Sequence, residues 1–300
     1  MKCNDLWHPN HPAEDKQLRP GLNFHFGDEV EDENKVWRGA VNDRFRLIIV
    51  LNGKLGLSYG DKQLCLSSEP HTNIHNAALV SCQTPELFSR QSFQGNACKR
   101  VSIGISSEWV ENTFDHYSGV QEHLQAMPHL HYISWSVSHY CAHIAAEMLT
   151  YQNCPIALQS IFLESKTLEI IAEAVSHLHK DMEFVKPPTQ HQPKVKGQLL
   201  ELKKFIQSHP SETHNIADLA ARVNMTISTL QRQFKQQFSL TVFEYIHKVR
   251  MVNAYLAIKA SERRITQIAG DVGYDNAGNF ATAFRRHFGM SPSKLRDQNK

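Results

Sequence analysis

Features that mark secreted, membrane-spanning or disulfide-bonded proteins are scarce in this 300-residue sequence. Its six cysteines show no Cys-x-x-Cys spacing and no regular framework, which is typical of reduced thiols. The longest apolar stretch, Leu47 to Leu51, is far too short to cross a membrane. The polar start of the chain does not resemble a signal peptide. We therefore expect a cytoplasmic protein with no membrane partner.

A large net charge of one sign is also lacking, since the formal net charge is +2. The two halves nevertheless differ. Residues 194–300 contain 17 basic and 8 acidic residues, a net charge of +9, whereas residues 1–193 contain 15 basic and 22 acidic residues, a net charge of −7. This asymmetry indicates a nucleic-acid-binding module joined to a part that does not bind DNA. Its affinity for DNA should fall steeply as the salt concentration rises.

One helical pattern occurs twice in the basic region. The first copy runs from Ile216 to Val223 and, after a short turn, from Thr226 to Phe238. The second runs from Ile265 to Val272 and from Asn276 to Phe288. In each copy the second segment has apolar residues at i, i+4 and i+8, which form one stripe along a helix: Leu230, Phe234 and Phe238, and Phe280, Phe284 and Phe288. A tandem of two helix-turn-helix units is typical of a DNA reader.

Residues suited to turns and helix caps lie between the two helices of each copy. Asn224 and Gly273 tolerate the left-handed conformation that ends a helix. The candidate N-caps are Thr226 or Ser228 in the first copy, and Asp275 or Asn276 in the second.

Polar and basic side chains should cover the outward face of each second helix. With the apolar stripes buried, the exposed residues are Ser228, Gln231, Arg232 and Lys235 in the first copy, and Asn279, Thr282, Arg285 and Arg286 in the second. Glutamine suits adenine and arginine suits guanine in the major groove. Because Arg232 corresponds to Thr282, the first helix is predicted to read bases more strongly, and the second to contact mainly phosphates.

A further helix is expected between the two copies, from Val242 to Lys259, with an exposed basic set of Lys248, Arg250 and Lys259. A helix of about 16 residues spans roughly 24 Å. With its flanking turns it can hold two reading helices about one DNA turn apart, roughly 34 Å, on one face of the duplex.

Residues from about 22 to 106 alternate apolar and polar positions as strands do. Phe45–Leu51 ends at Asn52-Gly53, a tight-turn signal, and Gly60-Asp61 marks another turn after Leu55–Tyr59. Short strands at this spacing favour a small β-barrel or a double-sheet jelly roll, which can hold a small ligand in its mouth. Four basic residues near strand ends are either contacts for an anionic ligand or solvated charges: Arg44, Arg46, Lys99 and Arg100.

Residues from about 107 to 182 favour helices. The last helix, Ile156 to Lys180, has apolar residues near one face: Ile161, Leu168, Ile171, Val175 and Leu178. That face either packs on the barrel or forms the interface of a homodimer, because DNA-binding proteins often use two-fold symmetry.

The sequence therefore predicts an α+β protein with two domains. Residues 1–183 form a ligand-sensing and possible dimerisation domain, with a β-barrel or jelly roll at about 22–106 and helices at about 107–182. Residues 184–193 form a proline-rich linker. Residues 194–300 form an all-α DNA-binding domain with two helix-turn-helix units.

With these patterns established, residues from about 195 to 296 resemble the AraC/XylS family of bacterial transcription regulators. The matching segments are Ile216–Ala220, Met225–Lys235, Val272–Tyr274 and Phe284–Pro292, and the ending Phe288-Gly-Met-Ser-Pro292 is highly specific to that family. The resemblance implies a sequence-specific DNA-binding regulator rather than an enzyme. It places Ser228, Gln231 and Arg232, and on the second helix Ala277, Gly278, Asn279 and Thr282, at positions that touch bases. Two residues depart from the family pattern: Ser239 replaces a usual glycine, and Thr282 stands where arginine is common.

Two segments of the first half, Arg46–Leu55 and Leu163–Ile171, are similar to the siderophore-responsive, pyochelin-regulator-like subgroup of this family. That similarity implies a ferric siderophore as effector, no resident cofactor, and activation of genes for iron uptake together with RNA polymerase.

Three other interpretations remain open. An AraC-type regulator could sense a different small molecule of carbon or aromatic-compound metabolism. A metal-dependent barrel enzyme could use His71/His75 or His139/His143, which have metal-ligand spacing. A DNA-repair alkyl-transfer protein would need a zinc-activated cysteine cluster, but Cys3, Cys65, Cys82 and Cys98 are scattered.

Overall fold

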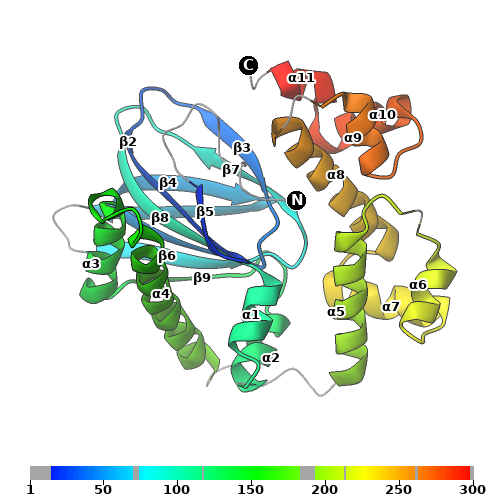
Figure 1. Cartoon of the computed structure of the whole chain (residues 1–300), viewed down its shortest axis with the longest axis horizontal. Coiled ribbons are helices and arrows are strands. Elements are labelled where there is room, and N and C mark those ends of the chain that lie inside the picture. Colours follow the sequence, from blue (N-terminus) through cyan, green and yellow to red (C-terminus); the bar gives the residue numbers. More distant parts are fainter. Residues whose placement is uncertain are drawn as a thin grey trace. The chain divides into compact units, whose positions relative to one another are not determined.

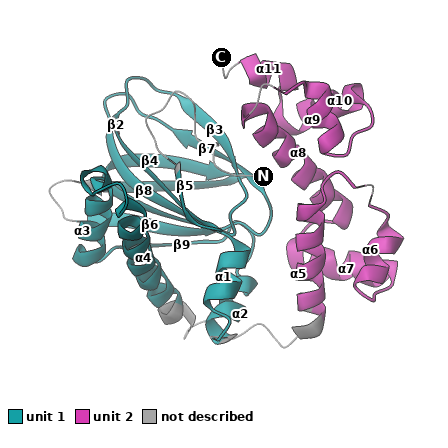
Figure 2. Cartoon of the chain, in the orientation of Figure 1, with its two compact units in different colours: residues 1–186 teal, residues 187–300 magenta. Residues whose placement is uncertain are grey.

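The computed structural model describes residues 15–69, 74–116, 118–182, 193–212, 214–260 and 263–297. The chain divides into two compact units, residues 1–186 and 187–300 (Figure 2). The linker expected at residues 184–193 lies outside the described residues, except for Pro193, which begins a helix. No helix in the described segments is long and apolar enough to span a membrane.

Antiparallel strands build most of the first unit (Figure 1). The described strands are β1 (Asp15–Arg19), β2 (Leu22–Val30), β3 (Val36–Val41), β4 (Phe45–Tyr59), β5 (Lys62–Glu69), β6 (Ile74–Ser81), β7 (Glu86–Gln91), β8 (Ala97–Ile105) and β9 (Tyr132–Ser136). Among these, β1, β3 and β9 each pair with one neighbour only. The α+β class is therefore confirmed, but the sheets are open rather than closed into a barrel.

Strand β4 belongs to two sheets. Its first half pairs with β6 and β8, and its second half, from Gly53 onward, pairs with β5 and β7. The prediction of a tight turn at Asn52-Gly53 was wrong, because β4 continues through these two residues with a register shift. Gly53 has φ of +78°, and a Cβ there would lie 2.3 Å from the carbonyl oxygen of Ala97. An Asn-Gly pair suits a tight turn, but in this strand it lies at a β-bulge. The bulge carries β4 from one sheet to the other.

The alternation along β4 separates two apolar cores. Phe45, Leu47 and Ile49 face four helices and form the larger core. Ile48 and Val50 face the interior between the two sheets, with residues of β5, β6 and β7. The helices are α1 (Ser107–Thr113), α2 (Ser118–Ala126), α3 (His139–Met148) and α4 (Gln159–Met182), with the short helix η1 (Tyr151–Asn153) between α3 and α4.

Three of the four basic residues noted near strand ends are buried rather than solvated. Arg44, Arg46 and Arg100 are at most 8 % exposed, whereas Lys99 is exposed and pairs with Asp28 at 3.1 Å. Burial lowers the pKa of the Arg44 guanidinium to about 10, which leaves it protonated at neutral pH. The guanidinium of Arg44 donates a hydrogen bond to the carbonyl oxygen of Leu124, at 2.7 Å, and so ties the residue before β4 to α2.

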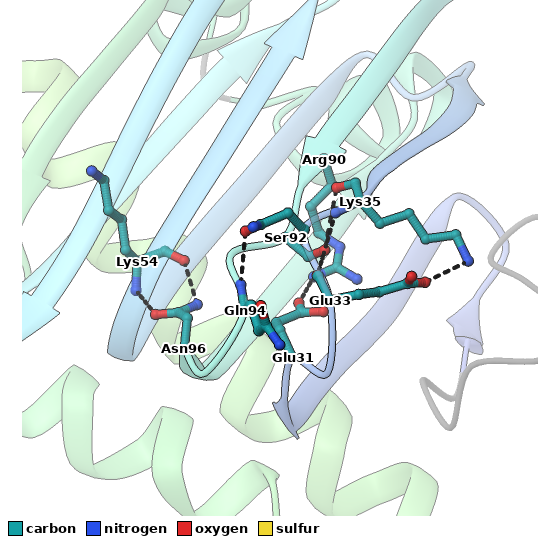
Figure 3. Close-up of polar contacts among 9 residues, drawn as sticks. Glu31, Glu33, Lys35, Lys54, Arg90, Ser92, Gln94 and Asn96 are labelled. Carbon is teal, nitrogen blue, oxygen red and sulfur yellow. Dashed lines mark hydrogen bonds and ion pairs between the residues drawn. The ribbon is translucent and has the colours of Figure 1, made fainter.

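A polar network joins the β2–β3 loop to the β7–β8 loop (Figure 3). Its buried element is the ion pair of Arg90 with Glu31. Ser92 donates from its hydroxyl group to the carbonyl oxygen of Glu33 at 2.8 Å. Asn96 accepts a hydrogen bond from the backbone amide of Lys54 at 2.9 Å, and so links the second loop to β4 just after its bulge. These contacts fix one end of the double sheet.

The second unit consists of helices. They are α5 (Pro193–Ser208), α6 (Ile216–Arg222), α7 (Ile227–Phe238), α8 (Val242–Ala260), α9 (Ile265–Asp271), α10 (Ala277–Phe288) and α11 (Pro292–Asp297). A core of apolar side chains joins α5, α6, α7 and the first half of α8. The second half of α8 packs against α9 and α11. Helix α8 thus belongs to both halves of the unit (Figure 1).

Candidate nucleic-acid interface

Helices α6 and α7 form the first predicted helix-turn-helix unit. Leu219 and Ala220 of α6 are buried at the contact with α7. Asn224 takes a positive φ of 51° in the turn, as its residue type allows. Thr226 is the N-cap of α7, since its hydroxyl oxygen accepts from the backbone amide of Thr229 at 3.2 Å. The stripe Leu230, Phe234 and Phe238 is buried, as predicted.

Helices α9 and α10 repeat this construction. Gly273 has φ of +83° in the turn, and the side-chain oxygen of Asn276 caps α10 by accepting from the amide of Gly278 at 2.7 Å. Phe280 and Phe284 are fully buried. Phe288 differs from its counterpart in the first copy because it is only partly buried.

All eight side chains predicted to face outward are exposed: Ser228, Gln231, Arg232 and Lys235 on α7, and Asn279, Thr282, Arg285 and Arg286 on α10. The four basic residues among them form no ion pair with any carboxylate in the described part of the chain. Two further residues of α7, Ile227 and Gln236, share this face and were missed, although the helical spacing places them beside Gln231 and Arg232.

Two models of known protein families match this chain. A family model described as the regulatory protein PchR N-terminal domain matches residues 11–190, and one described as a helix-turn-helix domain matches residues 219–298. The chain belongs to the PchR-type regulators of the AraC/XylS family.

Curated relatives of this AraC/XylS member match about a third of its length. The transcriptional activator RhaS of Klebsiella pneumoniae is 32 % identical over 100 residues, which cover 33 % of this chain and 36 % of RhaS. The Msm operon regulatory protein of Streptococcus mutans is 31 % identical over 103 residues, which cover 34 % of this chain and 37 % of that protein. The chain thus spans little more than a third of the length of these relatives.

Solved structures extend the likeness in fold to both units. The crystal structure of ToxT from Vibrio cholerae O395 has a TM-score of 0.57 and 13 % identity, and the match covers 93 % of this chain and 98 % of ToxT. ToxT from Vibrio cholerae strain SCE256, bound to an unsaturated fatty acid, has a TM-score of 0.59 and 14 % identity, with 94 % and 96 % covered. At this identity the comparison supports the fold of the AraC/XylS member and nothing more specific.

The two candidate reading helices of this regulator differ in their hydrogen bonds. Thr282 donates its hydroxyl hydrogen to the carbonyl oxygen of Gly278, 3.0 Å away on the same helix. Arg232, at the equivalent position of α7, forms no such bond within its own helix and extends from an exposed position. At this position α7 therefore presents a guanidinium group, whereas α10 presents a hydroxyl group that is bonded to its own backbone.

Arg250 of α8 connects the two helix-turn-helix units. It donates to the carbonyl oxygens of Pro210 at 3.0 Å and Glu212 at 2.8 Å, in the loop before α6, and to that of Gly273 at 3.1 Å, in the turn before α10. The prediction that Arg250 belongs to an exposed basic set was wrong. Because α8 is packed on both sides, Arg250 is only partly exposed, and burial lowers its pKa.

The other two members of that expected set are also less exposed than the sequence suggested. Lys248 and Lys259 are both partly buried, and burial lowers the pKa of Lys259. The Lys259 ammonium lies 5.5 Å from the centre of the Tyr255 ring. The basic character of the candidate interface therefore comes from α7 and α10 rather than from α8.

Ser239 adopts the left-handed conformation at the end of α7, with φ of 58° and ψ of 13°. Gly289 does the same at the end of α10, with φ of 71°. The turn after α7 therefore keeps the shape of its counterpart although a serine replaces the usual glycine. A residue with a Cβ is strained in this region.

Groups that could support metal-dependent catalysis are not assembled in the described residues. No three side chains of histidine, cysteine, aspartate or glutamate come together there as a metal site would require. His71 lies outside the described residues, and His143 on α3 lies 3.3 Å from Glu147. The five described cysteines are all free thiols.

Proposed function

We propose that this chain is a transcription regulator that inserts α7 and α10 into successive major grooves of double-stranded DNA. The observation that carries this proposal is the pair of equivalent helices, each with a buried apolar stripe and an exposed face whose cations form no ion pair among the described residues. A helix-turn-helix protein presents its second helix to the groove in this way.

The two helices take different roles in this proposal. Gln231 and Arg232 of α7 read adenine and guanine edges, because the two residue types form paired hydrogen bonds with those bases. Arg285 and Arg286 of α10 contact phosphates and set the register on the duplex. Lys235 adds a phosphate contact beside the base-reading residues. Binding should weaken steeply with salt because several phosphates are neutralised.

The proposed effector is a ferric siderophore, and the proposed outcome is activation of genes for iron uptake or synthesis of the siderophore. The match of residues 11–190 to the PchR N-terminal domain supports this assignment.

Effector binding would shift the regulator toward the state that docks both helix-turn-helix units. A ligand can shift this equilibrium only by its difference in affinity for the two states. The proposed partners are double-stranded DNA, RNA polymerase and, in a homodimer, a second copy of the chain. The setting that this proposal requires is the bacterial cytoplasm.

The test is selection of bound sites from random DNA by the purified full chain, alone and with a panel of iron-loaded siderophores and aromatic carboxylic acids. We expect enrichment of a site with two short blocks about one helical turn apart, stronger with one class of effector. The matched control is a double variant, Arg232→Ala with Arg285→Ala, which should enrich no site. Enrichment that depends on an aromatic acid and on no siderophore would refute the iron assignment and keep the DNA reader. No enrichment under any condition would refute the DNA reader.

A further inference from the structure

Ile227 is a large apolar side chain at the start of α7, the helix that the proposed function inserts into DNA. It is 42 % exposed, and in the described part of the second unit only Phe243, on α8, is another exposed large apolar side chain. A single apolar residue at a surface needs no explanation by itself. The position of Ile227 distinguishes it, because its exposed neighbours on α7 are the polar and basic Ser228, Gln231 and Arg232.

The packing of the unit does not require an apolar residue at this position. The buried stripe of α7 begins at Leu230, which is 0 % exposed. A hydrophobic staple joins the residue before a helix cap to the fourth residue of the helix. The cap is Thr226, so the staple positions are Met225 and Leu230, and both belong to the core around α7. Ile227 lies outside this pair, and a β-branched residue is not favoured by helix propensity.

Ile227 extends the line of outward side chains to the N-terminal end of α7. Ile227, Gln231 and Lys235 follow one another at intervals of four residues, which places them along one side of the helix. In a helix-turn-helix protein the N-terminal residues of the second helix contact the base edges. Ile227 therefore lies at the end that contacts bases, about 6 Å along the helix axis from Gln231, or about two base-pair steps.

We propose that Ile227 selects a thymine in the DNA site by packing against the C5-methyl group of that base. Thymine presents this apolar group in the major groove, where the other bases are recognised by their hydrogen-bonding atoms. The isoleucine side chain offers no hydrogen bond, so against another base it would cover a donor or acceptor without replacing the lost water. This inference rests on the proposed function, since it requires α7 to lie in the major groove.

The second helix-turn-helix unit differs at the equivalent position. Ala277 is the first residue of α10, as Ile227 is of α7, and it is partly buried rather than exposed. Its single methyl group reaches less far than the branched side chain of Ile227. We therefore expect the thymine in the block that α7 reads, within about two base pairs of the pair that Gln231 contacts. That block is the one in which Arg232→Ala changes the base preference.

Removal of one methyl group from the DNA tests the contact. The full chain is titrated with the duplex that it selects from random DNA, and each thymine in the block read by α7 is replaced in turn by deoxyuridine. Deoxyuridine keeps the hydrogen-bonding groups of thymidine and lacks only the C5-methyl group. We expect the wild type to lose about fourfold in affinity at one of these positions, which is the effect of one buried methyl group.

The variant Ile227→Ala identifies the side chain responsible. It shortens an exposed side chain and introduces a better helix former, so far-UV circular dichroism and the melting temperature should not fall. This variant should bind the thymine and deoxyuridine duplexes with equal affinity. Phe243→Ala is the matched control, because it removes the other exposed large apolar side chain from a different helix. It should retain the fourfold difference.

The reverse change in the DNA restores the methyl group on another base. Replacement of the T·A pair by C·G should weaken binding of the wild type. The base 5-methylcytosine carries a methyl group at the same place in the major groove, so it should recover part of the loss for the wild type and none for Ile227→Ala. Recovery by both proteins would overturn the inference.

Failure of the thymine contact is distinguishable from failure of the DNA reader. A chain that selects no DNA site would refute the reader, and the thymine contact with it. A selected site without thymine in the block read by α7, or one unaffected by every deoxyuridine there, would overturn the inference and leave the reader intact. A methyl effect that persists in Ile227→Ala would also overturn it, because another side chain would then make the contact.

Discussion

Replacement of Arg250 by alanine tests the proposed connection between the two helix-turn-helix units. The guanidinium donates to three carbonyl oxygens in two loops, at 3.0, 2.8 and 3.1 Å. A hydrogen bond from a charged donor contributes roughly 1.5–3 kcal/mol. Because Arg250 is only partly buried and the three bonds share one group, we expect Arg250→Ala to destabilise the helical unit by about 3 kcal/mol in total. For a unit of this size the melting temperature should fall by about 10 °C.

The assay combines thermal unfolding with DNA binding. Arg250→Lys is the informative comparison, since lysine keeps the charge but not the planar fork that reaches several carbonyl groups at once. It should lose most of the same stability. On DNA, Arg250→Ala should bind a site with both blocks much more weakly, and a site with the first block alone about as well as the wild type does.

The opposite pattern would refute this reasoning. If Arg250→Ala lowered affinity equally for one-block and two-block sites, with an unchanged melting temperature, then Arg250 would act as a simple phosphate contact. Arg286→Ala, which alters an exposed position on α10, serves as the reference for that behaviour.

Four further predictions concern the same unit. Arg232→Ala should lose roughly 1–3 kcal/mol of binding free energy at one base position, whereas Arg286→Ala should weaken binding to all sequences alike and lower the slope of affinity against salt by about one. DNA titrations at several salt concentrations distinguish the two variants, and equal effects would contradict the assigned roles. Ser239→Gly should raise the free energy of unfolding by about 1 kcal/mol in urea titrations, because glycine relieves the strain of a positive φ; a loss of stability would show that serine is not strained there. Gly273→Ala should destabilise the unit, since its Cβ would lie 2.7 Å from a guanidinium nitrogen of Arg250; an unchanged melting temperature would count against this contact. Burial lowers the pKa of His247 below its ordinary value of 6.5, and the charges of Arg250 and Arg286 lower it further. The unfolded chain therefore takes up a proton first, so the stability of the unit falls as the pH drops through about 6.5. Urea titrations of His247→Gln should show less of this loss than the wild type, and an identical loss would exclude His247 as its source.

The helical unit could be predicted in detail because its signals are local and repeated. The stripe Leu230, Phe234 and Phe238 fixes which side of α7 is buried, and the same spacing recurs on α10. Once a stripe is buried, the outward residues of that helix follow from geometry. That is why all eight predicted site residues are exposed.

The sequence failed where one residue pattern allows two structures. Asn52-Gly53 suits a tight turn and also a bulge, and only the pairing of β4 with four other strands selects the bulge. Arg250 sits on a helix whose outward face is covered by the loops before α6 and α10. Neither contact is local in the sequence, so periodicity alone could not reveal it.

The apolar residues of α4 show the same limit. The sequence places Ile161, Leu168, Ile171 and Leu178 near one face, but their burial divides them between the core and the exposed surface. A difference of three residues shifts a side chain by about 60° around a helix, which is enough to move it from the core to the surface. Burial by α3 and the sheet decides which residues remain exposed.

The most direct test of the central proposal is DNA cleavage from reagents tethered to the two candidate reading helices. Lys235→Cys and Arg285→Cys occupy equivalent exposed positions, and each would carry an iron chelate that cuts nearby DNA; the wild type treated with the same reagent controls for the native thiols. If α7 and α10 enter successive major grooves, the two variants should cut the same site at positions about 10 base pairs apart. Cleavage from only one variant, or from both at the same base pairs, would contradict a reader with two helices in successive grooves.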